Sequence, residues 1–415
     1  MQKGKWSKID LLLGIDVSKR WLSISFKTPG GERIEMLQVP NNRIGFMRLI
    51  AQIERRRRSR VVAGIESTSL YWENLARFLK QNGVKVVLVN PCHVKRIKEL
   101  IDNSPSKHDR KDSEVICDLV RIGYYVNEML PYGVYAELRE LTKFRHGLKK
   151  KLGRLKGEVR EILERHFPEY EDCFYSILSP TSLAVLRTYG LPFKLREVTV
   201  EDLTELIGKA SRGKLGWERA SSIIEAAKLT VGTGEGIEAA QNKLQLMFKE
   251  LDLYLWELKE IESRIRERVR EVPMSKYLLS IPGVGEIVLA GVLAETGDLR
   301  KFKSARALEK LAGLSLVTND SGDKKGLRCI SKKGRSLLRR YLYQIALVCV
   351  AKNKEFKEFY RYHIKVLKRN GMKVLTKLAA KILRVMYGVV KHGSFYDSQK
   401  VFENIRYREG VPVIA

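Results

Sequence analysis

Two apolar runs in the first part of the chain each end in an acidic residue. The run Leu11–Val17 carries Asp16 near its end, and the run Val61–Glu66 ends in the carboxylate of Glu66. Continuous apolar runs of this length are typical of strands buried on both faces of a parallel sheet. Carboxylates crowded at strand ends repel one another unless a cation neutralises them. The sequence therefore predicts a buried sheet that carries acidic side chains at one edge.

The pattern around these runs predicts the other elements of the first domain. Strands are expected at residues 21–28, 33–39 and 84–89, and helices at 41–56 and 71–82. The predicted order is three strands, a helix, a strand, a helix, a strand and a final helix. This is the order of elements in the ribonuclease H fold. The rest of the chain is predominantly helical, so the predicted fold class is α/β plus all-α. We place the ribonuclease-H-like domain at residues 1–135, a coiled-coil and helical insertion at 136–272, and a C-terminal helical domain at 273–415.

Two helical segments in the middle of the chain repeat apolar residues every seven positions. The first contains Leu141, Leu148, Leu155 and Ile162, and the second contains Leu244, Leu251, Leu258, Ile265 and Val272. Spacing of this kind is typical of coiled coils. The two segments could pair with each other or across a dimer, and core packing in a helical bundle would explain the same pattern.

Two more acidic residues, Asp109 and Asp112, lie at the start of a predicted helix. In ribonuclease-H-like sites one carboxylate lies on the first strand, a second on the fourth strand, and the remainder on a helix after the fifth strand. That order is matched by Asp16, Glu66, Asp109 and Asp112. Carboxylate oxygens are the ligands that Mg²⁺ prefers, and two such ions can hold the attacking and leaving oxygens of a phosphodiester. Singly, each acid is explained more simply as a turn, a helix cap or an exposed helix start, but the combination favours a Mg²⁺ site.

A large excess of positive charge indicates a polyanionic partner. Lys and Arg number 78 against 48 Asp and Glu, which gives a net charge of +30. One basic segment contains no acid and includes Lys324, Lys325, Arg328, Lys332, Lys333, Arg335, Arg339 and Arg340. Such a segment favours contact with nucleic-acid phosphates, although a solvated charged face is the simpler alternative.

Membrane insertion and disulfide chemistry are not predicted. No apolar stretch reaches the ~20 residues that a membrane-spanning helix needs. The five cysteines are scattered without a CxxC pair, which argues against a zinc ribbon or a disulfide framework. We expect a cytoplasmic, nucleoid-associated protein without a membrane partner.

Two short motifs in the C-terminal part suggest contact with nucleic acid. Residues 281–285, Ile-Pro-Gly-Val-Gly, form a helix-hairpin-helix signature in which Gly283 and Gly285 would let the backbone approach a phosphate. An ordinary turn between two packed helices fits this motif equally well. Ser321 stands beside Gly322 in a polar loop next to lysines. Its hydroxyl could attack a phosphodiester if a base or metal ion took its proton, but Ser-Gly in a polar loop is usually just a turn.

Several motifs occur in the order found in one protein family. They are Gly-Ile-Asp-Val-Ser-Lys at 14–19, Glu-Ser-Thr at 66–68, Lys-His-Asp-Arg-Lys-Asp at 107–112, the glycine turn at 281–285, Ser-Gly at 321–322 and Ile-Ser-Lys-Lys-Gly at 330–334. Together they resemble the DEDD transposases of bacterial and archaeal insertion sequences over nearly the whole chain. The resemblance implies a RuvC-like N-terminal domain, a coiled-coil arm and a C-terminal transposase domain. One departure is the segment 313–316, Gly-Leu-Ser-Leu, where the family often has Gly-Leu-x-Pro.

The resemblance also implies RNA-guided recombination. A noncoding bridge RNA from the element would pair with donor and target DNA, and the protein would cut and exchange the strands. The four acids would hold Mg²⁺, and Ser321 would form a covalent phosphoserine link to DNA, with Ser315 and Ser331 as competing serines. The family further implies a homo-oligomer, a dimer or a tetramer, whose active site combines the carboxylates of one protomer with the serine loop of another.

Two other functions are compatible with the sequence. A RuvC-like structure-specific DNA endonuclease would use the same carboxylates with a metal-activated water, and it would not need Ser321. A non-catalytic nucleic-acid-binding scaffold would use only the hairpin motif and the helical arms.

Overall fold

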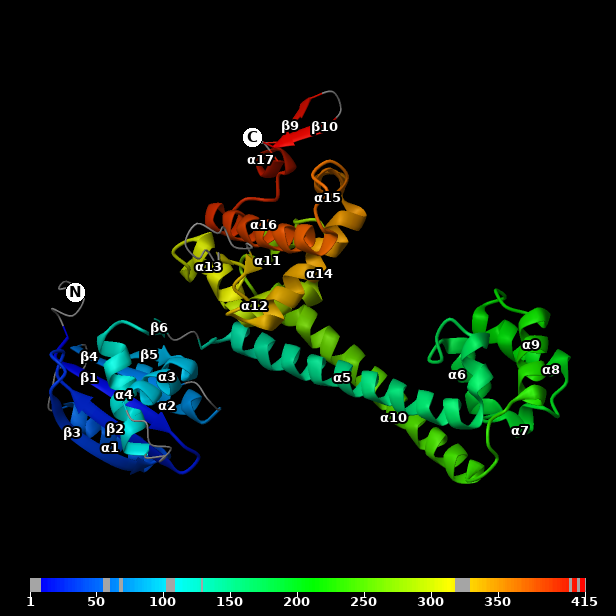
Figure 1. The fold of residues 1–415 in the computed structure, drawn as a ribbon, viewed down its shortest axis with the longest axis horizontal. Coiled ribbons are helices and arrows are strands. Elements are labelled where there is room, and N and C mark those ends of the chain that lie inside the picture. Colours follow the sequence, from blue (N-terminus) through cyan, green and yellow to red (C-terminus); the bar gives the residue numbers. More distant parts are fainter. Residues whose placement is uncertain are drawn as a thin grey trace. The chain divides into compact units, whose positions relative to one another are not determined.

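The chain folds into two compact units, Met1–Leu130 and Pro131–Ala415. The structure is a computed structural model, and it describes residues 9–54, 60–66, 70–101, 109–127, 130–317, 329–402, 405–408 and 411–414. Figure 1 shows a sheet flanked by helices in the first unit and a largely helical second unit. In the described part of the chain, none of the helices combines the length and apolar character that a membrane span requires.

The first unit is built on a mixed six-stranded sheet. Its strands are β1 (Leu11–Val17), β2 (Trp21–Lys27), β3 (Arg33–Pro40), β4 (Val61–Glu66), β5 (Lys85–Val89) and β6 (Val126–Asn127). They lie in the order β3-β2-β1-β4-β5-β6. The β1–β4 and β4–β5 pairs are parallel, whereas the other neighbours are antiparallel. The two central strands are almost wholly buried, as their continuous apolar runs predicted.

Helices cover both faces of this sheet. They are α1 (Arg43–Glu54), α2 (Tyr71–Gln81), α3 (Pro91–Ile101) and α4 (Asp109–Arg121). Side chains of β1 alternate between two cores, with Leu11 and Leu13 packed with α1 and α2, and Leu12 packed with α3 and α4. This alternation follows from the two-residue period of a strand. The predicted α/β domain and its order of elements are confirmed.

The second unit is mostly helical. Its helices are α5 (Val134–His166), α6 (Pro180–Thr188), α7 (Pro192–Leu195), α8 (Val200–Ser211), α9 (Trp217–Leu229), α10 (Ile237–Arg270), α11 (Ser275–Leu279), α12 (Glu286–Thr296), α13 (Ala305–Ala312), α14 (Ser336–Lys352), α15 (Lys354–Lys365), α16 (Gly371–His392) and α17 (Ser398–Phe402). Short 3₁₀ helices span Pro168–Cys173 and Leu299–Lys301, and β7 (Leu316–Val317) with β8 (Cys329–Ile330) and β9 (Ile405–Arg408) with β10 (Val411–Ile414) form two small antiparallel pairs.

The long helices α5 and α10 pack along each other within one chain (Figure 1). Their heptad residues Leu155 and Leu251 enter a core with α6, α8 and α9. Farther along the pair, Leu148 and Ile265 enter a second core with α12, α14 and α16. The predicted apolar spacing is thus used for pairing between the two segments of the same chain. The division of this unit into an insertion and a C-terminal domain stays a prediction.

Candidate active site

The register of the central strands brings Asp16 and Glu66 together. Ile15 of β1 pairs with Ile65 of parallel β4, so the two acids occupy the next rung of the ladder. Neighbouring strands lie about 4.8 Å apart, and residues at the same rung point to the same face. Both acids are half-buried, whereas Ile15 and Ile65 are completely buried on the opposite face.

Two glycines let helix α4 approach this acidic face closely. Gly14 and Gly64 lie two residues before the acids and pair with each other, so they share the acids' face. A Cβ atom on Gly14 would lie 2.0 Å from the carbonyl oxygen of Ser113 in α4. A Cβ atom on Gly64 would lie 2.2 Å from a methyl group of Val120 in the same helix. Because glycine has no side chain, Gly14 and Gly64 let α4 lie close to the strand ends.

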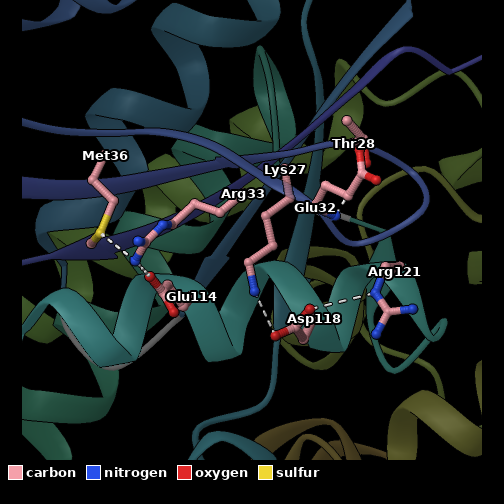
Figure 2. Close-up of polar contacts among 8 residues, drawn as sticks. All are labelled: Lys27, Thr28, Glu32, Arg33, Met36, Glu114, Asp118 and Arg121. Atoms are coloured by element: carbon pink, nitrogen blue, oxygen red, sulfur yellow. Dashed lines mark hydrogen bonds and ion pairs between the residues drawn. The ribbon is translucent and has the colours of Figure 1, made fainter.

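Ion pairs fix α4 against β2 and β3 (Figure 2). The buried Lys27 of β2 donates to the Asp118 carboxylate over 2.7 Å, and Arg33 of β3 donates to Glu114 over 3.0 Å. Asp118 also pairs with Arg121 of its own helix at 3.4 Å. Because Lys27 is nearly inaccessible to water, its pair with Asp118 is screened less than an exposed pair would be. These contacts hold the helix that carries Asp112.

Lys98, which the sequence analysis did not single out, forms an ion pair with a third carboxylate, that of Asp112. Lys98 of α3 forms an ion pair with Asp112 of α4, and the Asp112 side chain is only 18% exposed. Burial raises the pKa of Glu66, the nearby Asp16 carboxylate raises it further, and the Lys98 ammonium opposes both. The structure thus brings Asp16 and Glu66 together at neighbouring strand ends, and Lys98 lies between this pair and Asp112 through its charge on Glu66 and its ion pair. Asp109 is the first residue of α4, and its side chain lies outside the described residues.

The chemistry of these acids suits a divalent cation. The negative charges of Asp16 and Glu66 repel each other, and a bound divalent cation would relieve that repulsion. Carboxylates are the protein ligands that such cations prefer. That Asp16, Glu66, Asp109 and Asp112 are the ligands of Mg²⁺ stays a prediction. Among the side chains that the structure describes, no three acidic, His or Cys groups lie close enough together to hold an ion. Lys98 stands among them instead.

The serine loop lies in the other unit. Ser321 and its neighbours Lys324, Lys325 and Arg328 fall within residues 318–328, outside the described part of the chain. The strands on either side, β7 and β8, pair with each other. Ser331, one of the competing serines, donates its backbone N–H to the Ser315 carbonyl over 2.9 Å.

The glycine turn at 281–285 connects α11 to α12 and packs against α14. Gly283 has φ +80°, and a Cβ atom there would lie 3.0 Å from the backbone nitrogen of Cys349. The Cys349 thiol donates to the Pro282 carbonyl over 2.7 Å. Gly285 is exposed at the start of α12, where Glu286 pairs with Arg270 at 3.4 Å. Gly283 therefore has a packing role here, and phosphate binding by this turn stays a prediction.

The described part of the basic segment divides into internal and exposed groups. The Arg335 guanidinium contacts the backbone carbonyl of Glu295, and burial lowers the pKa of Arg335. Arg339 donates to the Ala312 carbonyl over 2.9 Å. In contrast, Lys332, Lys333 and Arg340 are exposed. The exposed three are the better placed to meet a phosphate.

Arg340 also lines a basic hollow between α5, α12 and α14. The hollow has a volume of about 490 Å³ and includes Arg145, His146 and Lys149 of α5. Apolar side chains of α12 and α14, including the exposed Leu347, line the remainder. Burial lowers the pKa of His146, and the positive charges of Lys150, Arg340 and Arg145 lower it further. These basic residues of α5 lie far from Arg340 in the sequence, and the fold brings them together.

Comparison with known proteins identifies the family. Residues 13–168 match the DEDD transposase model of IS110 elements, described as "Transposase", and residues 275–361 match the model described as "Transposase IS116/IS110/IS902 family". The chain belongs to the IS110 family of DEDD transposases. It is therefore a DNA transposase, an enzyme of strand cleavage and transfer, as the motifs predicted.

Relatives align with this transposase over most of its length. The IS110 insertion-element protein of Streptomyces coelicolor is 23% identical over 94% of this chain and 96% of its own. The IS116 insertion-element protein of Streptomyces clavuligerus is 25% identical over 91% and 94%. Among solved structures, Thermus thermophilus RuvC in complex with a Holliday junction substrate matches at 14% identity with a TM-score of 0.21, covering 29% of this chain and 99% of RuvC.

The close approach of α4 gives a stability prediction. Gly14→Ala should lower the free energy of unfolding of the transposase's first unit by roughly 3 kcal/mol, because the new methyl group meets backbone atoms of Ser113 and Cys117 that cannot rotate away. Urea denaturation followed by circular dichroism measures this. Gly153→Ala in α5 is the control, since its Cβ would meet nothing within 4 Å. Equal stability of Gly14→Ala and the wild type would contradict the described packing of α4 on β1.

Proposed function

We propose that this transposase moves its insertion sequence by cutting and rejoining DNA strands under the guidance of an element-encoded bridge RNA. In this proposal Asp16, Glu66, Asp109 and Asp112 hold Mg²⁺, and Ser321 is the nucleophile. The observation that supports the proposal is the position of Asp16 and Glu66 at neighbouring ends of parallel strands, with Lys98 acting on Glu66 and paired with Asp112. Donor DNA, target DNA and the bridge RNA would be its nucleic-acid partners, so we expect it to act at the nucleoid.

The division of labour follows from the chemistry of phosphoryl transfer. Bound Mg²⁺ would supply positive charge for the attacked phosphate and lower the cost of an alkoxide. The Ser321 hydroxyl would lose its proton and its oxygen would form a bond to phosphorus as one DNA P–O bond breaks. The departing DNA oxygen would take up a proton and leave as a hydroxyl. The phosphoserine link retains the phosphodiester for a later attack by another DNA hydroxyl. Rejoining then needs no further energy source.

Exposed basic residues of the second unit would guide the nucleic acid. The proposed contacts are Lys332, Lys333 and Arg340, with Arg145, His146 and Lys149 of the basic hollow. Lys324, Lys325, Arg328 and the turn at Gly283 and Gly285 belong to the same proposal. Arg335 and Arg339 would support this surface from within, since carbonyl groups already engage their guanidinium groups.

Salt dependence tests the hollow. In the double variant Lys149→Gln and Arg340→Gln, the slope of log K against log salt for duplex DNA should fall by about two, because each lost phosphate contact removes roughly 0.9. Filter binding between 50 and 200 mM salt measures the slope, with Lys214→Gln and Lys228→Gln, both exposed at the other end of the α5–α10 pair, as the matched control. If the slope of the double variant equals that of the wild type, Lys149 and Arg340 do not contact DNA phosphates.

An apolar stripe on α10 supports a homo-oligomer. Leu246, Leu253 and Trp256 are 60%, 50% and 60% exposed although they lie on the helix that pairs with α5. Their spacing of seven and then three places them on one face of the helix. We propose that this face meets a second protomer, in a dimer or a tetramer.

Copurified nucleic acid tests guidance by RNA. Transposase expressed from the whole insertion sequence should retain one RNA species, and sequencing should map it to an untranslated stretch of the element. Two loops of that RNA should be complementary to the donor and target DNA. Random cellular RNA alone in the purified protein would contradict bridge-RNA guidance while leaving strand transfer untouched.

A further inference from the structure

Lys98 of α3 contacts one of the proposed metal ligands and acts on a second. Its ammonium pairs with Asp112 and lowers the pKa of Glu66 against the effect of Asp16. The Lys98 side chain is 31% exposed and that of Asp112 is 18% exposed, so the pair lies at a half-buried position with reduced solvent screening. It joins α3 to α4, two helices that pack together on the acidic face.

A fixed cation beside acidic ligands affects metal binding in a definite direction. The Asp112 Oδ1 atom that contacts the Lys98 ammonium is one of the two carboxylate oxygens that Asp112 could offer a divalent ion. Asp112 therefore has to exchange one cationic partner for another when the ion binds. That exchange costs the free energy of the Lys98–Asp112 pair, whereas the neighbouring acids favour the doubly charged ion.

We propose that Lys98 is a displaceable counter-ion, which neutralises the carboxylates before Mg²⁺ arrives and competes with Mg²⁺ for Asp112. The inference rests on the proposed metal site. Lys98 acts here as a positioning residue, since it holds Asp112 and α4 next to β1 while the ion is absent. Its competition sets the metal concentration at which the site fills.

Titration with Mn²⁺ as the probe tests this role. The full-length protein is stripped of nucleic acid at high salt, and Mn²⁺ binding is followed by electron paramagnetic resonance of the free ion. Lys98→Met should bind Mn²⁺ about five- to tenfold more tightly than the wild type, which corresponds to loss of a partly buried ion pair. The same variant should melt at a lower temperature without metal and gain more from added Mn²⁺ than the wild type does.

Two variants separate competition from a general effect of charge or folding. Lys98→Arg keeps the cation and should retain near-wild-type Mn²⁺ affinity and stability. Lys95→Met removes a charge from the same helix, where Lys95 is 81% exposed and pairs with Glu99 at 3.9 Å, and it should leave Mn²⁺ affinity unchanged.

The outcomes distinguish this inference from the metal site itself. If Mn²⁺ binding depends on Asp16 but is equally tight or weaker in Lys98→Met, the counter-ion role is wrong and the metal site stands. If neither protein shows binding that Asp16→Asn abolishes, the metal site is wrong and the inference falls with it.

Discussion

Asp16→Asn is expected to reduce DNA strand cleavage and exchange by more than about 100-fold while nucleic-acid binding is retained. Loss of an outer-shell partner of a metal ligand already costs 10- to 100-fold, so loss of a proposed direct ligand should cost more. Asparagine keeps the shape of the side chain and removes its charge. A strand-exchange assay with labelled donor and target DNA measures the first effect, and filter binding measures the second.

Asp10→Asn is the matched control for this change. Asp10 lies just before the same strand, and its carboxylate pairs with Arg60 at 2.6 Å on a partly exposed surface. Exposed pairs of this kind contribute about 0–1 kcal/mol, so exchange should stay close to the wild-type level. If Asp16→Asn retained full exchange, both the transposase proposal and the endonuclease alternative would lose their catalytic site.

Ser321→Ala should abolish the covalent protein–DNA adduct, because alanine lacks the oxygen that would bond to phosphorus. Denaturing electrophoresis of the protein with labelled DNA detects the adduct. DNA binding and Mn²⁺ binding should stay at wild-type levels, since the proposed metal ligands belong to the first unit. Continued hydrolysis without an adduct in either protein would favour the alternative, a RuvC-like structure-specific endonuclease that uses metal-activated water.

Ser331→Ala and Ser315→Ala provide the controls for the nucleophile. The contact between these two residues joins backbone atoms, so alanine leaves it in place. Both variants should form the adduct. If instead Ser331→Ala or Ser315→Ala abolished the adduct and Ser321→Ala did not, the serine lost in that variant would be the nucleophile in place of Ser321. Mixing Asp16→Asn with Ser321→Ala protein should restore part of the adduct if carboxylates and serine come from different protomers. No restoration would point to a site within one protomer.

Much of the first unit could be predicted because burial leaves a simple pattern in a strand. Leu11–Val17 and Val61–Glu66 were predicted with the bounds that the structure gives. The start of α4 at Asp109 followed equally well from the sequence. The heptads predicted two long helices, but apolar spacing does not specify a partner, and the choice of α5 with α10 came from the three-dimensional packing.

The candidate site shows the same division at the level of single side chains. The order of the strands predicted that Asp16 and Glu66 would lie close together, since strand order limits where strand ends can lie. Spacing could not distinguish Lys98 from the other basic residues of its helix, or Arg335 and Arg339 from exposed neighbours such as Arg340. Those differences depend on which atoms the fold brings within reach.

The sequence by itself determined the helices and strands, the acidic strand ends and the basic character of this transposase. These features depend on local periodicity and on the count of charged residues, which neighbouring residues in the sequence already define. The tertiary structure decided the contact between α4 and the two glycines, the place of Lys98 among the acids, and which arginines face inward. These depend on atoms that are distant in sequence. The free energy of such contacts arises only when packing removes the groups from water.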